Sequence, residues 1–439
     1  MLKILFIHQN LPGQFRHVMT HYARVPGVEV FGLGDAARIR ENFVRPIEGV
    51  TVYGYAFNSK HESSSYRALR STDQAVRRGT AVAKSLKSLR DQGLRPDVIY
   101  GHPGWGEMLY VRDLFPDARI ASYCEFYFNR SGQDYGFDTE FSPVQEDDFH
   151  VRTENMTHAV SLLASDLGIS PTRWQQSRYP AELQSKIATV HDGVDTRVIK
   201  PDPTTTVILP ARNLALSSRD EVVTFASRNL EPYRGFHMFM RALPELLRRR
   251  RAAHVLIVGG DQVSYGRPLK GRTYREHLLT EVGERLDLSR VHFLGHLSHR
   301  DYLRVLQIST AHVYLTYPFV LSWSMLEAMA SGCVVIGSHT APVEEIIEDG
   351  RNGLLVDFFD RRQLVETVAQ VCAEREAYGA MRLAARATVA DHYDLQTVCL
   401  PRQIALLENQ SGASHAPYED IASRKTPKSN SNHYPRVSP

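Results

Sequence analysis

Short apolar runs alternate with longer segments of helical periodicity along most of the chain. One such segment, residues 80–93, places Val82, Leu86 and Leu89 on a single helical face, as expected of a helix that covers a sheet. Because β-rich runs alternate with helical segments, the pattern predicts βαβ units on a parallel sheet. In the first half of the chain, strands are predicted at residues 3–8, 28–33, 97–101, 119–123, 158–164 and 186–190.

The alternation pauses at residues 200–220, which are rich in Pro, Thr, Ser and Asn, and this pause indicates a domain linker. Both halves begin with a strand, a loop that contains Pro and Gly, and then a helix. Two similarly wound, Rossmann-like α/β domains are therefore expected to face each other across a cleft. Strands of the second half are predicted at residues 222–226, 254–258, 291–294, 312–315 and 334–337.

The predicted domain boundaries follow from this pattern. Residues 1–205 form the first domain and residues 206–388 the second. A helical segment, residues 389–410, is expected to pack back on the first domain. Residues 411–439 are polar, rich in Pro and Ser, and without periodicity, so they are predicted to be disordered.

Composition excludes several classes of protein. A chain of 439 residues with 43% hydrophobic content can build two cores. Lys and Arg number 52 against 49 for Asp and Glu, so the charge gives no case for nucleic-acid binding. The four cysteines lack the spacing of a zinc site or a disulfide framework, which favours a reducing compartment. No signal peptide or membrane span is predicted. A cytoplasmic protein is expected, with peripheral contact at the inner face of the cell membrane left open.

The stretch PFVLSWSMLEAMASG, residues 318–332, carries a single acid, Glu327, among small and apolar residues. Ser324 precedes Glu327 by three residues, which is the spacing of a capping box, so Glu327 could cap its own helix. Alternatively, the backbone amides of Val320, Leu321 and Ser322 could bind a diphosphate at the positive end of the helix. Glu327 would then accept hydrogen bonds from a ribose. The residues alone leave both interpretations open.

Two arginines in SRNLEPYRG suggest an anion site. Arg228 closes a predicted strand and Arg234 follows after a short loop, at the edge where open α/β sheets bind ligands. Two guanidiniums suit a diphosphate, although each alone could be an ordinary surface arginine. In LPGQFRH, Gly13 lies in a loop before a helix and would allow a ligand to approach the backbone closely.

Two further candidates follow strands of the first half. His102 comes directly after a predicted strand and is flanked by small residues, so its ring has room to face the cleft. It could equally be structural. Glu125 lies beside aromatic residues at the end of the next strand, where it is either a contact for an acceptor hydroxyl or an ordinary loop acid. No clustering of Asp and His suggests a metal, so no metal is expected.

Three motifs together resemble glycosyltransferase family 4, whose members are retaining enzymes of the GT-B fold that use nucleotide sugars. The resemblance covers about residues 1 to 410. The first motif is LEAMASGCVVIGSHTAPVEEIIEDGRNGLLVD (326–357), which looks like the donor-site helix of the family and the turns that follow it. The others are RNLEPYRG and HDGVDT (191–196), where Asp192 replaces the asparagine that is usual in the family.

The resemblance implies roles for several residues. Arg228 and Arg234 would bind the donor diphosphate, although the family usually has lysine at the position of Arg234. Glu327 would bind the nucleotide ribose, His102 would lie beside the donor sugar, and Gly13 would lie near the phosphates.

One position departs from the family. The first glutamate of the paired acids would fall eight residues before Glu327, where this chain has Phe319. Phe319 therefore belongs to the expected donor site but cannot accept hydrogen bonds from sugar hydroxyls.

The expected activity is transfer of a sugar from a nucleotide-diphosphate sugar to a hydroxyl of a glycan, lipid-linked or other acceptor, with retention at the anomeric carbon. The nucleotide sugar is a co-substrate, and neither a cofactor nor a metal is expected. Cell-envelope or exported polysaccharide synthesis is the expected setting, from what the family commonly does. Two alternatives are a nucleotide-sugar epimerase on the same fold and a non-catalytic binding subunit, which Phe319 would favour. The base, sugar, acceptor, linkage and oligomeric state are not specified by the sequence.

Overall fold

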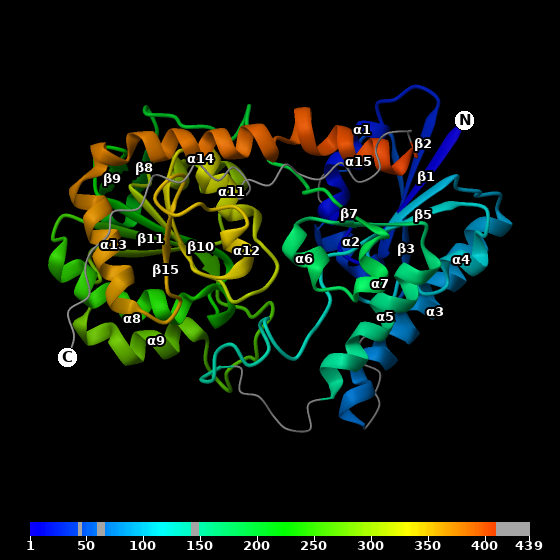
Figure 1. The fold of residues 1–439 in the computed structure, drawn as a ribbon, viewed down its shortest axis with the longest axis horizontal. Helices are drawn as coiled ribbons and strands as arrows, with labels where there is room; N and C mark the ends of the chain where they lie inside the picture. The colour runs from blue at the N-terminus through cyan, green and yellow to red at the C-terminus, as the bar shows by residue number, and fades with distance from the viewer. Residues whose placement is uncertain (43–45, 59–65, 142–148, 410–439) are drawn as a thin grey trace, which may run out of the picture.

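The computed structural model describes the chain except residues 43–45, 59–65, 142–148 and 410–439 (Figure 1). The C-terminal tail predicted to be disordered, residues 411–439, lies outside the described residues. The described chain builds two parallel β-sheets, each with helices around it, and a short antiparallel hairpin between them in sequence. The predicted fold class, two α/β domains with parallel sheets, is confirmed.

The first sheet has seven parallel strands in the order β3-β2-β1-β4-β5-β6-β7. Its central strands are continuous apolar runs, as expected of strands that are covered on both faces. The strands are β1 (Leu2–Ile7), β2 (Val28–Asp35), β3 (Val50–Tyr55), β4 (Val98–Gly101), β5 (Arg119–Tyr123), β6 (Leu167–Ser170) and β7 (Ile187–Thr189). The helices of this domain are α1 (Arg16–Tyr22), α2 (Ala36–Asn42), α3 (Arg70–Asp91), α4 (Val111–Leu114), α5 (His150–Ala164), α6 (Arg173–Ser177) and α7 (Ala181–Gln184).

The second sheet has six parallel strands in the order β12-β11-β10-β13-β14-β15, so the chain reverses direction across the sheet beside β10. Ligands bind at such switch points in open α/β sheets. The strands are β10 (Val222–Asn229), β11 (His254–Gly260), β12 (Val291–Gly295), β13 (Ala311–Tyr314), β14 (Val334–Ser338) and β15 (Leu354–Val356). The helices are α8 (Phe236–Arg249), α9 (Tyr274–Val282), α10 (His299–Gln307), α11 (Trp323–Ala330), α12 (Ala341–Glu344) and α13 (Arg361–Ala373).

The last described helices return from the second domain to the first along one side of the molecule (Figure 1). They are α14 (Gly379–His392), a π-helical turn (Leu395–Cys399) and α15 (Leu400–Leu407). Leu395 and Leu407 are buried in the same apolar cluster as Phe6 of β1. Tyr22 of α1 also donates a hydrogen bond to Glu408. The end of the described chain is therefore part of the core of the first domain.

One prediction about the elements is wrong, and one predicted loop segment contains strands. Residues 158–164, predicted as a strand, form the end of α5, in which Leu162 is buried and Leu163 is exposed. A short apolar run cannot be assigned to a strand or a helix by periodicity alone. The predicted linker at residues 200–220 contains the hairpin of β8 (Thr206–Leu209) and β9 (Leu214–Ser217).

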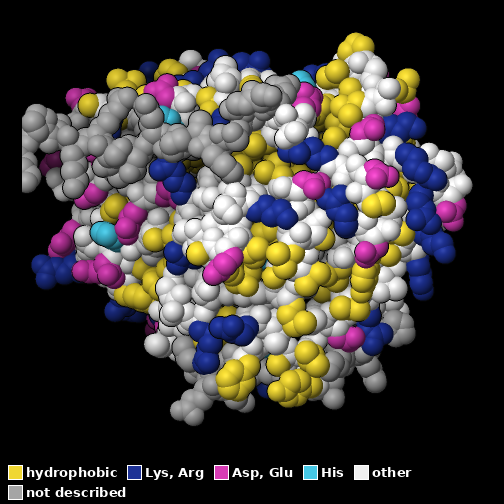
Figure 2. All heavy atoms as spheres, turned by 45° about the vertical axis from the view of Figure 1, so that its right-hand side comes forward, with side chains coloured by type: hydrophobic (Ala, Val, Ile, Leu, Met, Phe, Trp, Pro, Cys, Tyr) yellow, Lys and Arg dark blue, Asp and Glu magenta, His cyan; other side chains and the backbone are white. Residues whose placement is uncertain are grey.

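The surface carries both signs of charge. On the face drawn in Figure 2, Lys and Arg side chains are interspersed with Asp and Glu, in keeping with the small net charge of +3. The four cysteines are buried free thiols. None of the described helices is both long and apolar enough to cross a membrane.

Candidate functional site

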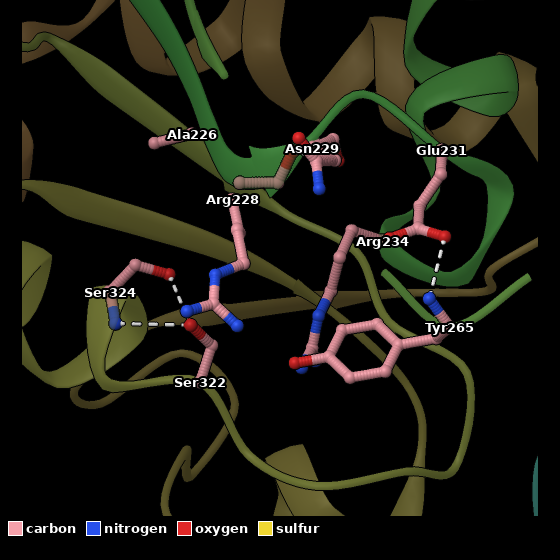
Figure 3. A pocket seen from close by; sticks show the side chains of 9 residues that line it. Ala226, Arg228, Asn229, Glu231, Arg234, Tyr265, Ser322 and Ser324 are labelled. Atoms are coloured by element: carbon pink, nitrogen blue, oxygen red, sulfur yellow. Dashed lines mark hydrogen bonds between the residues drawn. The ribbon is translucent and has the colours of Figure 1, made fainter. Parts of the chain in front are cut away.

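A pocket lies at the carboxyl end of β10, where the strand turns into α8 (Figure 3). The turn is sharp because Gly235 adopts a left-handed conformation with φ of 69°, and a Cβ there would lie 2.3 Å from Leu315. Only glycine fits such a position. The turn directs Arg234 into the pocket that Arg228 borders. The lining residues are Ala226, Ser227, Arg228, Asn229, Glu231, Arg234, Tyr265, Ser322 and Ser324.

The two predicted arginines share this pocket but differ in their surroundings. Arg228 is exposed, and no described residue forms a hydrogen bond or ion pair with it. Arg234 is buried, and its Nη1 donates hydrogen bonds to Thr316 Oγ1 at 2.8 Å and to the carbonyl of Val320 at 2.9 Å. The guanidinium also lies 5.5 Å from the ring centre of Tyr265. Arg234 thus fixes the loop before α11, and Arg228 offers an uncompensated positive charge.

Glu231, a buried acid that was not predicted, lines the pocket on the side of Tyr265, away from Arg228. Its carboxylate accepts hydrogen bonds from the amides of Ser264, Tyr265 and Gly266 at 2.9 to 3.1 Å. These contacts place the Tyr265 ring over Arg234 (Figure 3). Glu231 lies within the motif RNLEPYRG, but its partners are more than 30 residues away, so no local pattern along the chain indicates this contact.

The capping-box interpretation of Glu327 is wrong. The helix α11 begins at Trp323, and its N-cap is Ser322, whose Oγ accepts the amide of Ser324 at 3.3 Å. Glu327 is the fifth helical residue, which is too far into the helix to close a capping box. Its carboxylate instead lies 2.8 Å from Nε2 of His299, the first residue of α10. This carboxylate raises the pKa of His299.

The amides before α11 are only partly available for a ligand. The amide of Ser322, one of the three predicted donors, already donates to the hydroxyl of Tyr314 at 2.8 Å. The Val320 carbonyl accepts from Arg234, and the Leu321 side chain is buried beneath α11. An anion at this position would therefore depend on the helix end and the arginines more than on the Ser322 amide.

His102 follows β4 and is fixed at both ring nitrogens. Its Nδ1 accepts a hydrogen bond from the Gly104 amide at 3.0 Å, so Nε2 carries the proton and donates to Glu125 Oε2 at 3.2 Å. The ring also stacks on Trp105 with centroids 4.3 Å apart. The other carboxylate oxygen of Glu125 accepts from Gln14 at 3.0 Å. Both oxygens of Glu125 therefore already have partners within the protein.

The charge of Glu125 is stabilised by these contacts. Burial alone would raise its pKa, but the hydrogen bonds from His102 and Gln14 outweigh burial and lower the pKa. Gln14 was not predicted as a site residue. It follows Gly13, whose φ is 48° and whose Cβ would lie 2.7 Å from the ring of His8. Glycine is needed at this turn, and the turn brings Gln14 to Glu125.

Phe319 lies in an aromatic group. The ring is mostly buried, and its centroid lies 4.7 Å from that of Phe126, 4.9 Å from Tyr265 and 5.4 Å from Tyr233. Phe126 belongs to the first domain, so Phe319 joins the two domains. Phe319 is not among the residues that line the arginine pocket.

Asp192 connects the histidine side of the site to the arginine side. Its Oδ2 accepts hydrogen bonds from the Tyr123 hydroxyl of β5 at 2.9 Å and from Trp323 Nε1 of α11 at 2.8 Å. Burial raises the pKa of Asp192 to about 7, although both hydrogen bonds act in the opposite direction.

The predicted residues form two groups, Arg228, Arg234 and Glu327 in the second domain and His102, Glu125 and Gly13 in the first. Within the described part of the chain, no group of three or more His, Cys, Asp or Glu side chains could hold a metal ion.

The fold and the pocket at the switch point beside β10 define a two-domain protein of the GT-B type. Residues 27–199 match the family model described as glycosyl transferase family 4 group, and residues 212–388 match the model described as glycosyl transferases group 1. The two matches cover most of the chain. The chain belongs to glycosyltransferase family 4.

Individual relatives are distant. A D-inositol 3-phosphate glycosyltransferase from Nocardioides is 28% identical over 51% of this chain and 48% of its own length. A GDP-mannose-dependent alpha-(1-6)-phosphatidylinositol monomannoside mannosyltransferase from Mycolicibacterium smegmatis is 28% identical over 56% and 62%. The first of these matches thus spans about half of the curated relative.

Solved structures resemble the chain over nearly its full described length. Sucrose-phosphate synthase from Thermosynechococcus elongatus has a TM-score of 0.67 and 16% identity, covering 93% of this chain and 99% of that one. Anabaena HepE in complex with UDP has a TM-score of 0.61 and 15% identity, covering 93% and 100%. At these identities the likeness shows the shared fold.

Proposed function

We propose that the protein is a retaining glycosyltransferase that moves a sugar from a nucleotide-diphosphate sugar to an acceptor hydroxyl. The observation that carries this proposal is the pocket at the end of β10. There an exposed guanidinium, Arg228, and a buried one, Arg234, face Ser322 and Ser324 at the start of α11. A diphosphate would be stabilised there by two cations and by the positive end of a helix.

The chemistry needs charge stabilisation more than covalent help. As the anomeric bond breaks, negative charge builds on the leaving diphosphate. Arg228 has no partner among the described residues, so it can bind that charge without first breaking a contact. Arg234 is already fixed by Thr316 and Val320, so its position costs little reorganisation. Preorganised charges of this kind stabilise the transition state more than the ground state. Retention at the anomeric carbon is inferred from the family.

The other predicted residues keep their proposed roles with changes in detail. Glu327 would bind the nucleotide ribose with one carboxylate oxygen while His299 contacts the other. His102 would lie beside the donor sugar, and a sugar oxygen near Nε2 would share its proton with Glu125. Glu125 is better explained as the group that orients His102 than as an acceptor contact, because both of its oxygens are occupied. Gly13 would allow close approach of the donor.

Names of relatives suggest the substrate class without fixing it. The match to a mannosyltransferase of a phosphatidylinositol glycolipid and the shared fold with a UDP-binding protein favour a nucleotide sugar as donor and a glycan or lipid-linked hydroxyl as acceptor. We place the activity in cell-envelope or exported polysaccharide synthesis. Action in the cytoplasm, with a peripheral membrane contact left open, belongs to the same proposal.

A screen of nucleotide sugars with release of nucleoside diphosphate as the readout tests the proposal. Release is expected for at least one donor when acceptors from membrane extracts are present, and Arg228→Ala should abolish most of it. Arg251→Ala is the matched control, because Arg251 is an exposed arginine just beyond the far end of α8. Donor that is converted without any acceptor to an isomer would favour an epimerase. Tight binding without release from any donor would favour a binding subunit. The aromatic ring of Phe319, packed on Phe126, would then be a feature of that non-catalytic site.

A further inference from the structure

A segment of the first domain packs on the second. Residues 126–141, here called the crossing segment, follow β5 and extend toward the second domain (Figure 1). Phe126 lies in the apolar cluster that forms the core of the second domain, and Phe137 and Phe141 pack against it. Phe137 lies 5.2 Å from the ring centre of Tyr317, and Phe141 lies 5.0 Å from that of His237. Apolar burial therefore fixes this segment to the second domain.

Three acids of the crossing segment each contact the second domain. Asp134 accepts a hydrogen bond from the Tyr233 hydroxyl at 2.8 Å. Glu140 forms two bonds of 2.7 Å with the Arg241 guanidinium. Asp138 accepts from the Tyr317 hydroxyl at 2.6 Å, and the same carboxylate oxygen lies 3.1 Å from His237 Nε2.

Asp138 differs from the other two acids in that both of its partners are buried. Asp138 is only 3% exposed, and Tyr317 and His237 are buried with it. Burial alone would raise the pKa of Asp138, but the contacts with His237 and Tyr317 outweigh it and lower the pKa, so the carboxylate is charged at neutral pH. A buried charge of this kind is costly unless it is paired and hydrogen-bonded.

The partners of Asp138 belong to the two elements that position Arg234. His237 is three residues beyond Arg234, in the first turn of α8. Tyr317 lies in the loop at residues 315–322, and the Val320 carbonyl of this loop accepts a hydrogen bond from Arg234. The Tyr317 amide also donates to the Tyr233 carbonyl at 3.0 Å, which joins the two elements directly. Asp138 reaches this junction from the other domain.

We propose that Asp138 is a positioning residue for the donor pocket: it fixes the loop at residues 315–322 against the start of α8, so that a residue of the first domain sets the geometry of a pocket in the second. The proposal rests on the proposed function for what the pocket binds. Loss of the carboxylate would leave the Tyr317 hydroxyl and the His237 ring without their charged partner in a buried place. The loop would then shift, and with it the Val320 carbonyl that orients Arg234.

The test compares Asp138→Ala with Glu140→Ala in the full chain. Glu140 is the matched control, because it contacts Arg241 further along α8 and Arg241 keeps a second partner, Glu281. Binding of UDP and GDP is measured by calorimetry, and amide hydrogen exchange is measured for residues 315–322. We expect Asp138→Ala to weaken the nucleotide affinity by about tenfold or more and to speed exchange in the loop. Glu140→Ala should change neither beyond about twofold.

Equal effects of both variants, or an unchanged loop exchange in Asp138→Ala, would overturn the proposal. If Asp138→Ala does not fold, Tyr317→Phe replaces it, since this change removes only the hydroxyl that contacts Asp138 and keeps the ring packing. If the wild-type chain binds neither nucleotide, the proposed function loses its support, and the exchange measurement alone decides whether Asp138 fixes the loop.

Discussion

At the scale of single residues, Arg228 and Arg234 border one pocket, but Arg228 is exposed and Arg234 is buried. Substituting each in turn should therefore distinguish an effect on ligand binding from an effect on folding. Arg228 is exposed without a partner among the described residues, so Arg228→Ala should leave the melting temperature unchanged. It should raise the transfer barrier by about 2 to 4 kcal/mol, as loss of one preorganised donor does. Arg234→Ala should do the same and also reduce the free energy of unfolding by about 1 to 3 kcal/mol, because it leaves the buried Thr316 hydroxyl and the partly buried Val320 carbonyl without their donor.

Thermal unfolding and transfer rates of both variants check this contrast. Arg234→Lys should recover part of the transfer rate, since the charge is kept while the fork of hydrogen bonds is lost. Transfer at the wild-type rate by Arg228→Ala would show that this pocket does not bind the diphosphate.

Glu327 gives a second prediction at this scale. Because the structure excludes the capping box, Glu327→Gln should not weaken a helix cap, and its contact with the largely exposed His299 is worth little stability. The variant should therefore melt close to the wild type but bind nucleoside diphosphate much more weakly. His299→Ala is the control that removes the partner and keeps the acid. Unchanged nucleotide affinity in Glu327→Gln would mean that Glu327 serves only to pair with His299.

At the scale of elements, secondary structure was predicted best where the hydrophobic periodicity and the turn residues indicate the same boundaries. The strand at residues 222–226 and the turn to α8 were predicted from an apolar run followed by Pro and Gly, and Arg228 and Arg234 were placed at the strand end for that reason. The end of α5 was predicted as a strand because its apolar residues follow one another closely in the sequence. Only the folded structure shows that some of these residues are buried and others are exposed. Contacts such as Gln14 with Glu125 join residues more than 100 positions apart, and no local pattern encodes them.

The end of the described chain gives an element-scale prediction. A chain that ends at Gln410 should fold and transfer as the full chain does, because the composition of the remaining tail cannot support a core. A chain that ends at Tyr393 should lose much of its stability, because it lacks Leu395 and Leu407, which are buried in the first domain. Each such side chain contributes about 1.5 to 3 kcal/mol when fully buried. Circular dichroism melts and transfer assays of the two chains test this, and a folded but inactive chain ending at Gln410 would show that the tail contributes to the site.

At the scale of the whole molecule, the two domains contact each other through buried polar groups on more than one side. Asp138 of the first domain contacts Tyr317 of the second. In the other direction, the carboxylate of Glu345 in the second domain accepts hydrogen bonds from the amides of Arg173 and Trp174 at the start of α6. Asp192 joins Tyr123 to Trp323. Because each contact satisfies groups that are hidden from water, separating the domains would expose or orphan them. The relative position of the domains is therefore specified by particular residues rather than left to the linker alone.

Asp192 makes this interdomain contact sensitive to pH. Its pKa is raised to about 7 by burial, whereas the unfolded chain should titrate at about 3.9. Between these values the folded state keeps a proton that the unfolded state has released. Stability contributed by the protonated Asp192 is therefore complete below about pH 4, falls as pH rises toward 7, and is lost above it, with a slope on the order of 1 kcal/mol per pH unit.

Asp192→Asn should remove this dependence, because asparagine has an oxygen that can accept the same hydrogen bonds but does not ionise. The nearby Tyr123, Glu125 and His102 are present in both proteins, so subtracting the two unfolding free energies isolates Asp192 to a first approximation. The advantage of the variant over the wild type should therefore grow between pH 5 and pH 7 and level off by pH 8. Urea unfolding at these pH values measures the difference, and a constant difference across the range would show that Asp192 is already ionised in the folded protein at pH 5. Trp323→Phe tests the same carboxylate from its partner: without the indole donor that stabilises its charge, Asp192 should hold its proton to higher pH, and the decline in stability should extend above pH 7.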